Sequence, residues 1–163
     1  MRVFINEYEK MTGYEHTNIF KVFYNALFNN QYKARVLAQK MQMAKNEIGK
    51  RYLRNRLIKK YNISIGMNTK IGENLSLQHV EIGGTILTGI IGNNCIIYHQ
   101  VTLGNKNNQY PILGDNVTVY PGAKIIGNVK IGNNVIVGTN AVVLHDVPSD
   151  SVVAGVPARI INT

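Results

Sequence analysis

The stretch Leu113–Val143, LGDNVTVYPGAKIIGNVKIGNNVIVGTNAVV, carries an aliphatic residue at every sixth position. The residues in phase are Leu113, Val119, Ile125, Ile131, Val137 and Val143. An α-helix repeats its buried face every 3.6 residues and a half-buried strand every two residues, so neither element explains this period. A coil with straight edges explains it, because each edge turns one aliphatic side chain inward. The stretch therefore predicts a repeat architecture.

The rest of each hexad agrees with this geometry. Compact residues that fit tight corners follow the aliphatic residues by four positions: Val117, Ala123, Val129, Val135 and Ala141. Gly-Asp-Asn at 114–116 and Gly-Asn-Asn at 132–134 supply residues that tolerate left-handed backbone angles. The same frame runs upstream through 91–103 and 65–77, with a slip of four residues before Leu113 and of two residues between the earlier blocks. A β-rich domain with chance spacing would not keep so many residues in phase.

Four segments then carry a resemblance to a known family. Val142–Pro148 and Ala154–Ile160 look like the segment that closes the repeat in the serine acetyltransferase branch of the hexapeptide-repeat acyltransferases. Val101–Gly104 and Pro121–Asn128 match that branch in order and spacing. The resemblance covers residues 60–161 and implies a mainly β fold, a left-handed parallel β-helix with three hexads per coil. It also implies an O-acetyltransferase with acetyl-CoA as acyl donor.

The N-terminal third lacks the repeat and shows two helical stripes instead, which predict helices over 17–28 and 32–58. The stripes consist of Ile19, Phe20, Phe23, Ala26 and Leu27, and of Leu37, Met41, Ala44, Ile48 and Tyr52. We therefore expect an N-terminal helical segment over residues 1–60. Residues 61–163 are expected to form the left-handed β-helix acyltransferase domain with its closing C-terminal segment.

Positive charge is concentrated in one segment. Residues 31–60 hold ten Lys or Arg and one acid, Glu47, so their net charge of +9 equals that of the whole chain. Such a segment could rest on anionic lipid as a peripheral membrane contact, attract nucleic acid, or present a solvated face whose apolar stripe packs on the β-helix or a neighbouring subunit. No RNA- or DNA-binding motif accompanies the charge, so no nucleic-acid partner is expected.

The single cysteine, Cys95, stands at the compact corner position of its hexad, where packing explains it. The sequence shows neither a signal-peptide pattern nor an apolar run long enough to span a bilayer. These features predict a reducing, cytoplasmic setting, with the inner face of the membrane as an option for the basic segment.

The chemistry is expected among the four histidines, because imidazole exchanges protons near neutral pH. His16 precedes the first helix and His145 follows the last aliphatic residue in phase, so surface and closing-turn roles are expected for them. His79 and His99 each follow an inward aliphatic residue by two positions. Twenty residues separate them, which is one coil of eighteen plus the slip of two. We therefore expect them to stack on adjacent coils at the same corner, where each could instead only hydrogen-bond to backbone carbonyls.

In the branch that this chain resembles, the same column lines the cleft between subunits where the pantetheine arm of acetyl-CoA lies. This implies a homotrimer with its active sites between subunits. His79 matches the catalytic histidine, the general base of a direct acyl transfer without an acyl-enzyme. His99 stands where the branch carries an amide, and could donate a hydrogen bond to the oxyanion, as could Tyr110. The implied cofactor contacts are Gly104, Pro121, Gly122, Lys124, Gly138, Thr139 and Arg159, with Arg159 as the preferred partner of phosphate.

The acceptor side departs from the serine enzymes. Gln78 replaces an aspartate, Ser64 replaces an upstream aspartate that orients the histidine, and Gln109-Tyr110 replace an Arg-His pair on a loop. The ammonium group of serine would lack carboxylate partners, and its carboxylate would lack an arginine. We therefore predict a sugar hydroxyl as acceptor, on a small or lipid-linked saccharide of bacterial surface polysaccharide biosynthesis. Gln78, Glu81, Gln109 and Tyr110 are the predicted acceptor contacts.

Three alternatives stay open. The first is a serine O-acetyltransferase of cysteine biosynthesis. The second is a metal hydratase of the γ-carbonic-anhydrase type, which shares the fold and binds zinc through three converging histidines. No third histidine is in phase with His79 and His99, so no metal is expected. The third is a non-catalytic trimeric scaffold, which would explain neither the two stacked histidines nor the closing segment.

Overall fold

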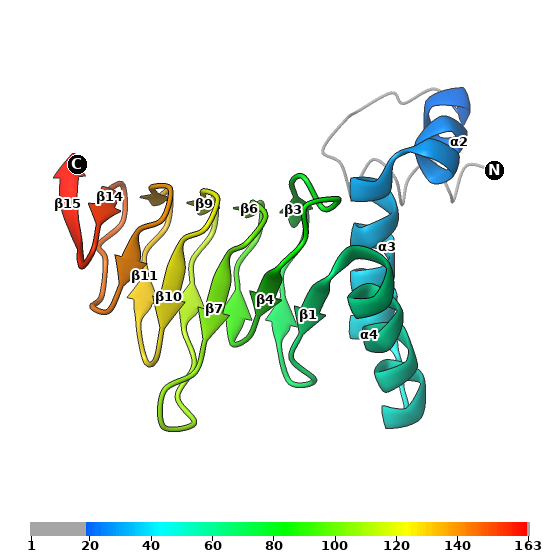
Figure 1. Cartoon of the computed structure of the whole chain (residues 1–163), viewed down its shortest axis with the longest axis horizontal. Helices are drawn as coiled ribbons and strands as arrows, with labels where there is room; N and C mark the ends of the chain where they lie inside the picture. The colour runs from blue at the N-terminus through cyan, green and yellow to red at the C-terminus, as the bar shows by residue number, and fades with distance from the viewer. Residues whose placement is uncertain (1–18, 163) are drawn as a thin grey trace.

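The computed structural model describes residues 19–162. Within this range three helices come first: α2 (Ile19–Phe28), α3 (Asn30–Met43) and α4 (Glu47–Tyr61). Short strands then follow one another along a straight axis, with α3 and α4 at one end and β15 at the other (Figure 1). The helices therefore stand before the first coil and do not interrupt the repeat.

The strands form three sheets. The first sheet holds β1 (Ile63–Ile65), β4 (Thr85–Leu87), β7 (Thr102–Gly104), β10 (Lys124–Ile126) and β13 (Val142–Val143). The second sheet holds β2 (Lys70–Ile71), β5 (Ile90–Ile91), β8 (Ile112–Leu113) and β11 (Lys130–Ile131). The third sheet holds β3 (Ser76–Leu77), β6 (Ile96–Ile97), β9 (Thr118–Val119), β12 (Ile136–Val137), β14 (Val152–Gly155) and β15 (Ala158–Asn162).

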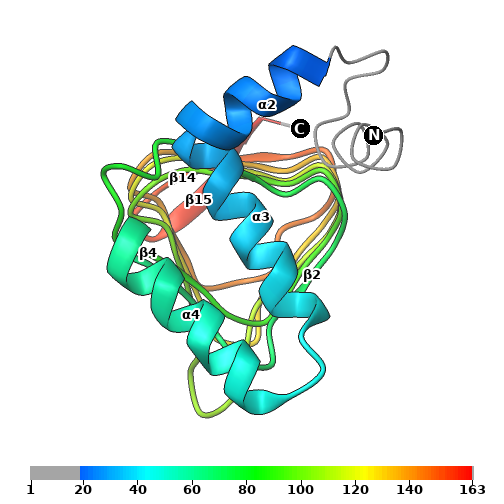
Figure 2. The ribbon, with the colours of Figure 1, turned by 90° about the vertical axis from the view of Figure 1, so that its right-hand side faces the viewer.

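The chain visits the three sheets in the same order in every coil, and neighbouring strands run parallel except β14 and β15. Figure 2, which looks along the axis, shows the resulting triangular outline. This is a parallel β-solenoid of the left-handed β-helix type, so the predicted fold class is confirmed.

Three edges separate the sheets. The histidine edge joins the third sheet to the first and consists of 78–84, 98–101, 120–123 and 138–141. The loop edge joins the first sheet to the second and consists of 66–69, 88–89, 105–111, 127–129 and 144–146. The asparagine edge joins the second sheet to the third and consists of 72–75, 92–95, 114–117, 132–135 and 148–151.

The inward aliphatic residues predicted from the hexads fill the core. All twelve except Ile71 are buried. Strand pairing places them in register, with Ile97 opposite Leu77 in one direction and opposite Val119 in the other. Removing each such side chain from water contributes about 1.5–3 kcal/mol, and the same position in every coil supplies it. The core is therefore a stack of equivalent layers.

The asparagine edge turns through left-handed backbone conformations. Asn74, Asn94, Asn116 and Asn134 have φ between 55° and 59°, and Asp150 has φ 61°. Each asparagine donates its side-chain N–H to the side-chain oxygen of the next residue in this row, over 2.7–3.2 Å. Asparagine thus tolerates the backbone angle and satisfies its own amide along the edge.

The two phase slips have different structures. The slip of four is one insertion, the loop 105–111 between β7 and β8. The slip of two is the sum of two opposite changes. Leu87 lies ten residues after Leu77, which is four more than a hexad. Ile91 then lies four residues after Leu87, which is two fewer than a hexad. The long part, 78–84, is on the histidine edge and contains His79. Sequence spacing showed only the sum of the two changes.

The predicted helix over 32–58 is wrong, since α3 ends at Met43 and α4 begins at Glu47. Ala44 is extended, and Asn46 caps α4 by accepting a hydrogen bond from the Gly49 N–H at 2.6 Å. A capping asparagine satisfies donors that a continuous helix would bond internally, so it starts a new helix. The other predicted helix is observed as α2 from Ile19, and residues 17 and 18 of it, like His16, lie outside the described residues.

Helices α3 and α4 cover the open end of the solenoid (Figure 2). Ala34, Ala38 and Met41 of α3 and Leu57 and Tyr61 of α4 are buried there. The predicted stripe is wrong in its second half, because Ile48 and Tyr52 are 85% and 61% exposed. The helical period is interrupted at residues 44–46, so the buried face of α4 does not continue the stripe of α3.

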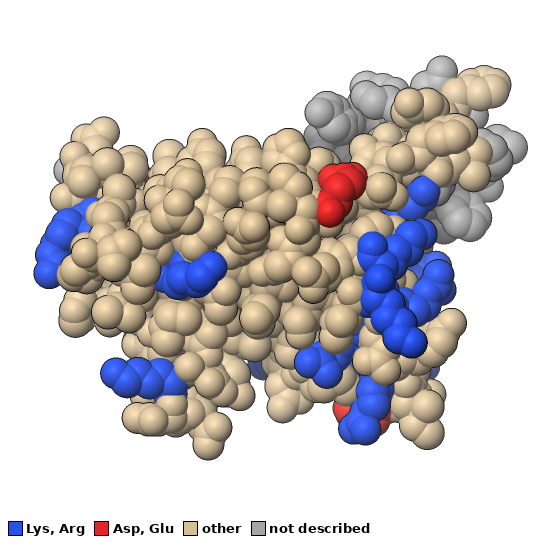
Figure 3. Space-filling model, viewed as in Figure 1, with Lys and Arg blue, Asp and Glu red and all other residues tan. Residues whose placement is uncertain are grey.

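Lys and Arg side chains gather over α3 and α4 (Figure 3). In the range from 19 to 162, no helix combines the length and the hydrophobicity needed to cross a bilayer. Contact of this basic surface with lipid or with a neighbouring subunit stays a prediction.

We expect Asn116→Ala to lower the free energy of unfolding by about 2 kcal/mol, because alanine is disfavoured in the left-handed conformation and the hydrogen bonds of the edge are lost. Asn116→Gly loses the same hydrogen bonds but fits the backbone angle, so its loss should be smaller. Urea denaturation measures both variants. Equal losses would contradict the role assigned to the backbone angle.

We also expect the Cys95 thiol to be unreactive in the folded protein. Cys95 is fully buried, and burial, with a smaller contribution from the charge of Asp115, raises the pKa of its thiol. Less thiolate forms and reagents cannot reach it, so an alkylating reagent at about pH 8 should label only the urea-unfolded chain. Mass spectrometry measures the labelling, and rapid labelling of the folded chain would contradict this expectation.

Candidate functional site

His79 and His99 lie against each other on the histidine edge. Their ring centroids are 5.8 Å apart and their planes meet at 83°, an edge-to-face contact. The register of β3 and β6 produces this contact, since Leu77 pairs with Ile97 and the Gln78 N–H donates to the Ile97 carbonyl at 2.8 Å. The stacking predicted from the spacing of twenty residues is therefore observed.

His79 begins the long excursion of its coil. Its φ of 53° is left-handed, and its carbonyl accepts a hydrogen bond from the Ile82 N–H at 3.1 Å, which turns the chain out of β3. The side chain is exposed, and no hydrogen bond to another residue of the range 19–162 holds its imidazole. The rings of His99 and Tyr98 contact it instead.

His99 is half-buried and its Nδ1 is fully buried without a hydrogen-bond partner in the described part of the chain. Leaving a buried polar atom unpaired costs about 1–3 kcal/mol, and such atoms are rare in folded proteins. Because Nδ1 is closed to solvent, a bound molecule can meet this ring only through its other atoms.

Two tyrosines beside the histidines were missed in the sequence. The ring of Tyr98 lies 5.9 Å from that of His79, and Tyr98 stacks on Tyr120 at 5.2 Å with an interplanar angle of 23°. Both residues follow an inward aliphatic residue directly and are one coil plus the slip of four apart. The counting that placed the histidines could have found them. They form an aromatic wall along the histidine edge.

The predicted cofactor residues fall into three groups. Pro121, Gly122, Lys124 and Thr139 lie along or directly beside the histidine edge, where the Lys124 ammonium donates to the Gln100 carbonyl at 2.6 Å. A Cβ added to Gly122 would stand 2.0 Å from Asn140 Oδ1, so this position has no room for a side chain. In this part of the histidine edge, Gly122 is tightly packed against Asn140 and Lys124 supplies an ammonium group.

Gly138 begins the last segment of this edge, and Arg159 lies on β15 of the third sheet. A Cβ added to Gly138 would meet the Cβ of Ala154 at 3.2 Å, and Ala154 pairs with Arg159 across β14 and β15. The Arg159 guanidinium is exposed and donates to the Ala158 carbonyl at 3.1 Å. Gly104 is placed differently, because it ends β7 toward the loop edge.

The predicted acceptor residues also divide between two edges. Gln78 and the exposed Glu81 lie with His79, and the Gln78 amide donates to Ser76 Oγ at 2.7 Å. Gln109 and Tyr110 lie in the loop at the loop edge, which Figure 1 shows projecting away from β3, β6 and β9. One chain therefore does not bring Gln109 or Tyr110 to its own histidine pair.

Ser64, which replaces the upstream aspartate of the serine enzymes, contacts an arginine. Ser64 Oγ accepts a hydrogen bond from the Arg54 guanidinium at 3.3 Å, and the same side chain donates to the Ile65 carbonyl at 3.0 Å. Helix α4 thus brings a cation to this position of β1. Sequence comparison within the repeat could not show it, because Arg54 lies before the repeat.

A search for groups of three or more His, Cys, Asp or Glu side chains that could hold a metal ion finds none among the described residues.

Comparison with known proteins agrees with this architecture. Residues 110–145 match the family described as bacterial transferase hexapeptide (six repeats). The serine acetyltransferase of Synechococcus elongatus is 42% identical over 106 residues, which are 61% of this chain and 42% of that protein. The Staphylococcus aureus serine acetyltransferase is 44% identical over 107 residues, 61% of this chain and 49% of that protein. The chain thus spans about half the length of the curated relatives it matches.

Solved structures give the same result. Neisseria gonorrhoeae serine acetyltransferase in complex with serine superimposes with a TM-score of 0.75 and 28% identity, covering 86% of this chain and 60% of that one. A serine acetyltransferase in complex with CoA superimposes with a TM-score of 0.70 and 30% identity, covering 85% and 60%. The repeat of this chain is thus hexapeptide-transferase-like and, within that group, serine acetyltransferase-like, as the resemblance in its sequence predicted.

The prediction of a sugar acceptor in polysaccharide biosynthesis is wrong, since these relatives and structural neighbours are serine acetyltransferases. That prediction relied on the replacement, in this chain, of charged residues that serine acetyltransferases carry on the acceptor side. Their absence does not decide the acceptor, because charged groups also arrive from outside the repeat, as Arg54 does at Ser64.

Proposed function

We propose that this chain is an acetyl-CoA-dependent O-acetyltransferase that acts on the hydroxyl of serine. The observation that carries the proposal is the edge-to-face contact of His79 and His99 on adjacent coils, in a chain whose relatives are serine acetyltransferases. The pair supplies a base and a second polar ring at one point of the edge.

In the proposed reaction, His79 removes the hydroxyl proton of the acceptor while its oxygen attacks the thioester carbonyl. The carbon–sulfur bond then breaks, and the protonated imidazole returns its proton to the departing CoA thiolate. The products are the O-acetyl ester and CoA. His79 suits this role because no hydrogen bond from residues 19–162 occupies its imidazole, and general base catalysis of this kind contributes about 10²- to 10⁴-fold.

His99 is proposed to donate to the oxyanion that develops on the thioester carbonyl. The contact of its ring with that of His79 at 5.8 Å supports this role, and a donor aimed at developing charge is most effective where water is excluded.

The pantetheine arm is proposed to run along the histidine edge past Pro121, Gly122 and Thr139. Lys124 and Arg159 are the proposed phosphate partners. The Lys124 ammonium donates to the carbonyl of Gln100, the residue after His99, and Arg159 lies on β15 at the C-terminal end of the solenoid.

The acceptor side is proposed to combine groups from two subunits of a homotrimer. Glu81 lies two residues beyond His79 and could hold the ammonium group of serine. Gln109 and Tyr110 would come from the loop edge of a neighbouring subunit, because their own chain places them on the wrong edge.

We expect His79→Ala to reduce the turnover of L-serine by about 10²- to 10⁴-fold with the binding of CoA retained, because only the base is lost. His99→Gln should reduce turnover less, since an amide still donates. Thiol release measures turnover and calorimetry measures CoA binding. His145→Ala removes an exposed histidine on the loop edge and is the control that should keep full activity.

Normal serine turnover by a folded His79→Ala variant would contradict its role as base. Complete loss in His99→Gln would instead move that role to His99.

We expect two inactive variants to complement each other if the site lies between subunits. His79→Ala damages one edge and a Gln109→Ala/Tyr110→Ala double variant damages the other. After joint refolding in equal amounts, about one quarter of the sites in random trimers combine two intact edges, so about that share of wild-type activity should return. Sedimentation checks that trimers form, and activity no higher than that of either variant alone would contradict the shared site.

A further inference from the structure

Helix α4 carries a concentrated positive charge. Its 15 residues include six Lys or Arg and one acid, Glu47. Arg54 is half-buried and donates to β1, but Arg51, Arg56 and Lys59 are exposed. Among residues 19–162, no carboxylate forms an ion pair with these three exposed side chains. A cluster of cations of this kind attracts an anionic surface.

Two large apolar side chains lie on the same side of this helix. Ile48 is 85% exposed and Tyr52 is 61% exposed. An α-helix places residues four and eight positions apart on one face, so Ile48, Tyr52 and Arg56 form a row about 12 Å long. The buried Leu57 follows Ile48 by about two and a half turns and therefore lies on the opposite face, against the solenoid.

The exposed cations lie beside this row. Arg51 and Lys59 are also eight residues apart, so they form the neighbouring row on the helix. We call the five exposed residues Ile48, Arg51, Tyr52, Arg56 and Lys59 the outer face of α4. Its N-terminal half holds the two apolar side chains, and two of its three cations lie in the C-terminal half. The outer face thus combines positive charge with apolar side chains that are left in water.

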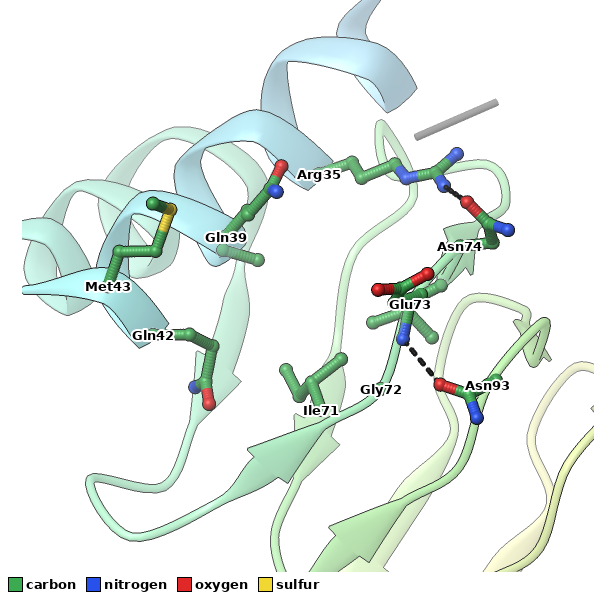
Figure 4. A pocket seen from close by; sticks show the side chains of 11 residues that line it. Arg35, Gln39, Gln42, Met43, Ile71, Gly72, Glu73, Asn74 and Asn93 are labelled. Carbon is green, nitrogen blue, oxygen red and sulfur yellow. Dashed lines mark hydrogen bonds between the residues drawn. The ribbon is translucent and has the colours of Figure 1, made fainter. Parts of the chain in front are cut away.

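The outer face of α4 is separate from the cavity beside α3. That cavity, of about 340 Å³, lies between α3 and the asparagine edge (Figure 4). Its lining residues come from α3, from residues 71–75 and from Asn93, and none of them belongs to α4. Figure 2 shows α4 on the viewer's side of the solenoid end, so its outer face is open to a large partner.

Three kinds of large partner can be compared. A second copy that met this surface with its own α4 would bring like charges together. A nucleic acid would offer phosphates to Arg56 and Lys59, but its binding is driven by charge and gains nothing from Ile48 or Tyr52. An anionic lipid bilayer suits both kinds of residue, because headgroup phosphates attract the cations and the interfacial layer accepts isoleucine and tyrosine side chains.

We propose that the outer face of α4 binds the surface of an anionic lipid bilayer. The helix lies along the plane of the membrane, with Ile48 and Tyr52 among the headgroups and the three cations against lipid phosphates. The opposite face of α4 stays packed on the solenoid, so binding requires no unfolding of the domain. Acetyl transfer to serine needs no membrane, so vesicle binding and serine turnover test separate functions.

The first test is sedimentation of the full chain with lipid vesicles at about 0.1 M salt, where the Debye length is about 10 Å. Vesicles with one part phosphatidylglycerol in two of phosphatidylcholine should bind the protein, and vesicles of phosphatidylcholine alone should not. Arg56→Gln/Lys59→Gln should weaken binding by about 10- to 30-fold, because each cation near an anionic surface contributes about fivefold. The matched control Lys106→Gln/Lys130→Gln removes two exposed lysines of the repeat and should change binding by less than about twofold.

The second test concerns the apolar contact. The chain contains no tryptophan, so Tyr52→Trp introduces a single fluorescent probe, and brominated lipid in the vesicles should quench it. Leu144→Trp, at a position 48% exposed on the loop edge, is the control that should stay unquenched. Ile48→Ser should weaken vesicle binding by about threefold or more and leave binding to a DNA duplex unchanged, since only lipid accepts the apolar side chain.

Three results would overturn the proposal. The first is no binding to the phosphatidylglycerol vesicles. The second is equal weakening by the control pair of lysine variants, which would show attraction to net charge alone. The third is unquenched fluorescence of the Tyr52→Trp variant together with unchanged vesicle binding by Ile48→Ser, which would assign the surface to a polyanion such as nucleic acid.

Discussion

Each coil of this protein rests on the previous one through parallel backbone hydrogen bonds and through the same inward aliphatic position. The rest of the structure depends on this stacking. Because Leu77, Ile97, Val119 and Val137 follow one another in register, residues just beyond them are also brought together, coil after coil. The same constraint demands left-handed corners, which the asparagine edge supplies. Once the core is in register, the residues that follow its inward positions are aligned on the histidine edge as well.

Insertions are tolerated only at the edges, since a longer strand would break the stacking. The chain has two of them, 78–84 on the histidine edge and 105–111 on the loop edge. One presents His79 and the other presents Gln109 and Tyr110. Their separation within one chain supports a site completed by a neighbouring copy. In such an assembly the β-solenoid positions the reacting groups, and the two insertions carry them.

The acceptor illustrates a limit of reasoning from missing residues. The replacements at Gln78, Ser64 and Gln109-Tyr110 suggested that serine could not be held. The structure shows a guanidinium from α4 on Ser64, and the relatives are serine acetyltransferases. An absent side chain is a weak argument in a site to which a helix outside the repeat and a second subunit can contribute.

The sequence by itself determined the solenoid, its inward residues and the contact of His79 with His99. A period of six leaves one simple geometry, and positions in a regular coil can be counted. Only the tertiary structure decided the split of 32–58 into α3 and α4, the burial of His99 Nδ1 and the cavity between Gln42 and Glu73. The split and the cavity depend on how helices outside the repeat pack on its end, and the burial of His99 Nδ1 depends on side-chain packing at the histidine edge. No period in the sequence records such contacts.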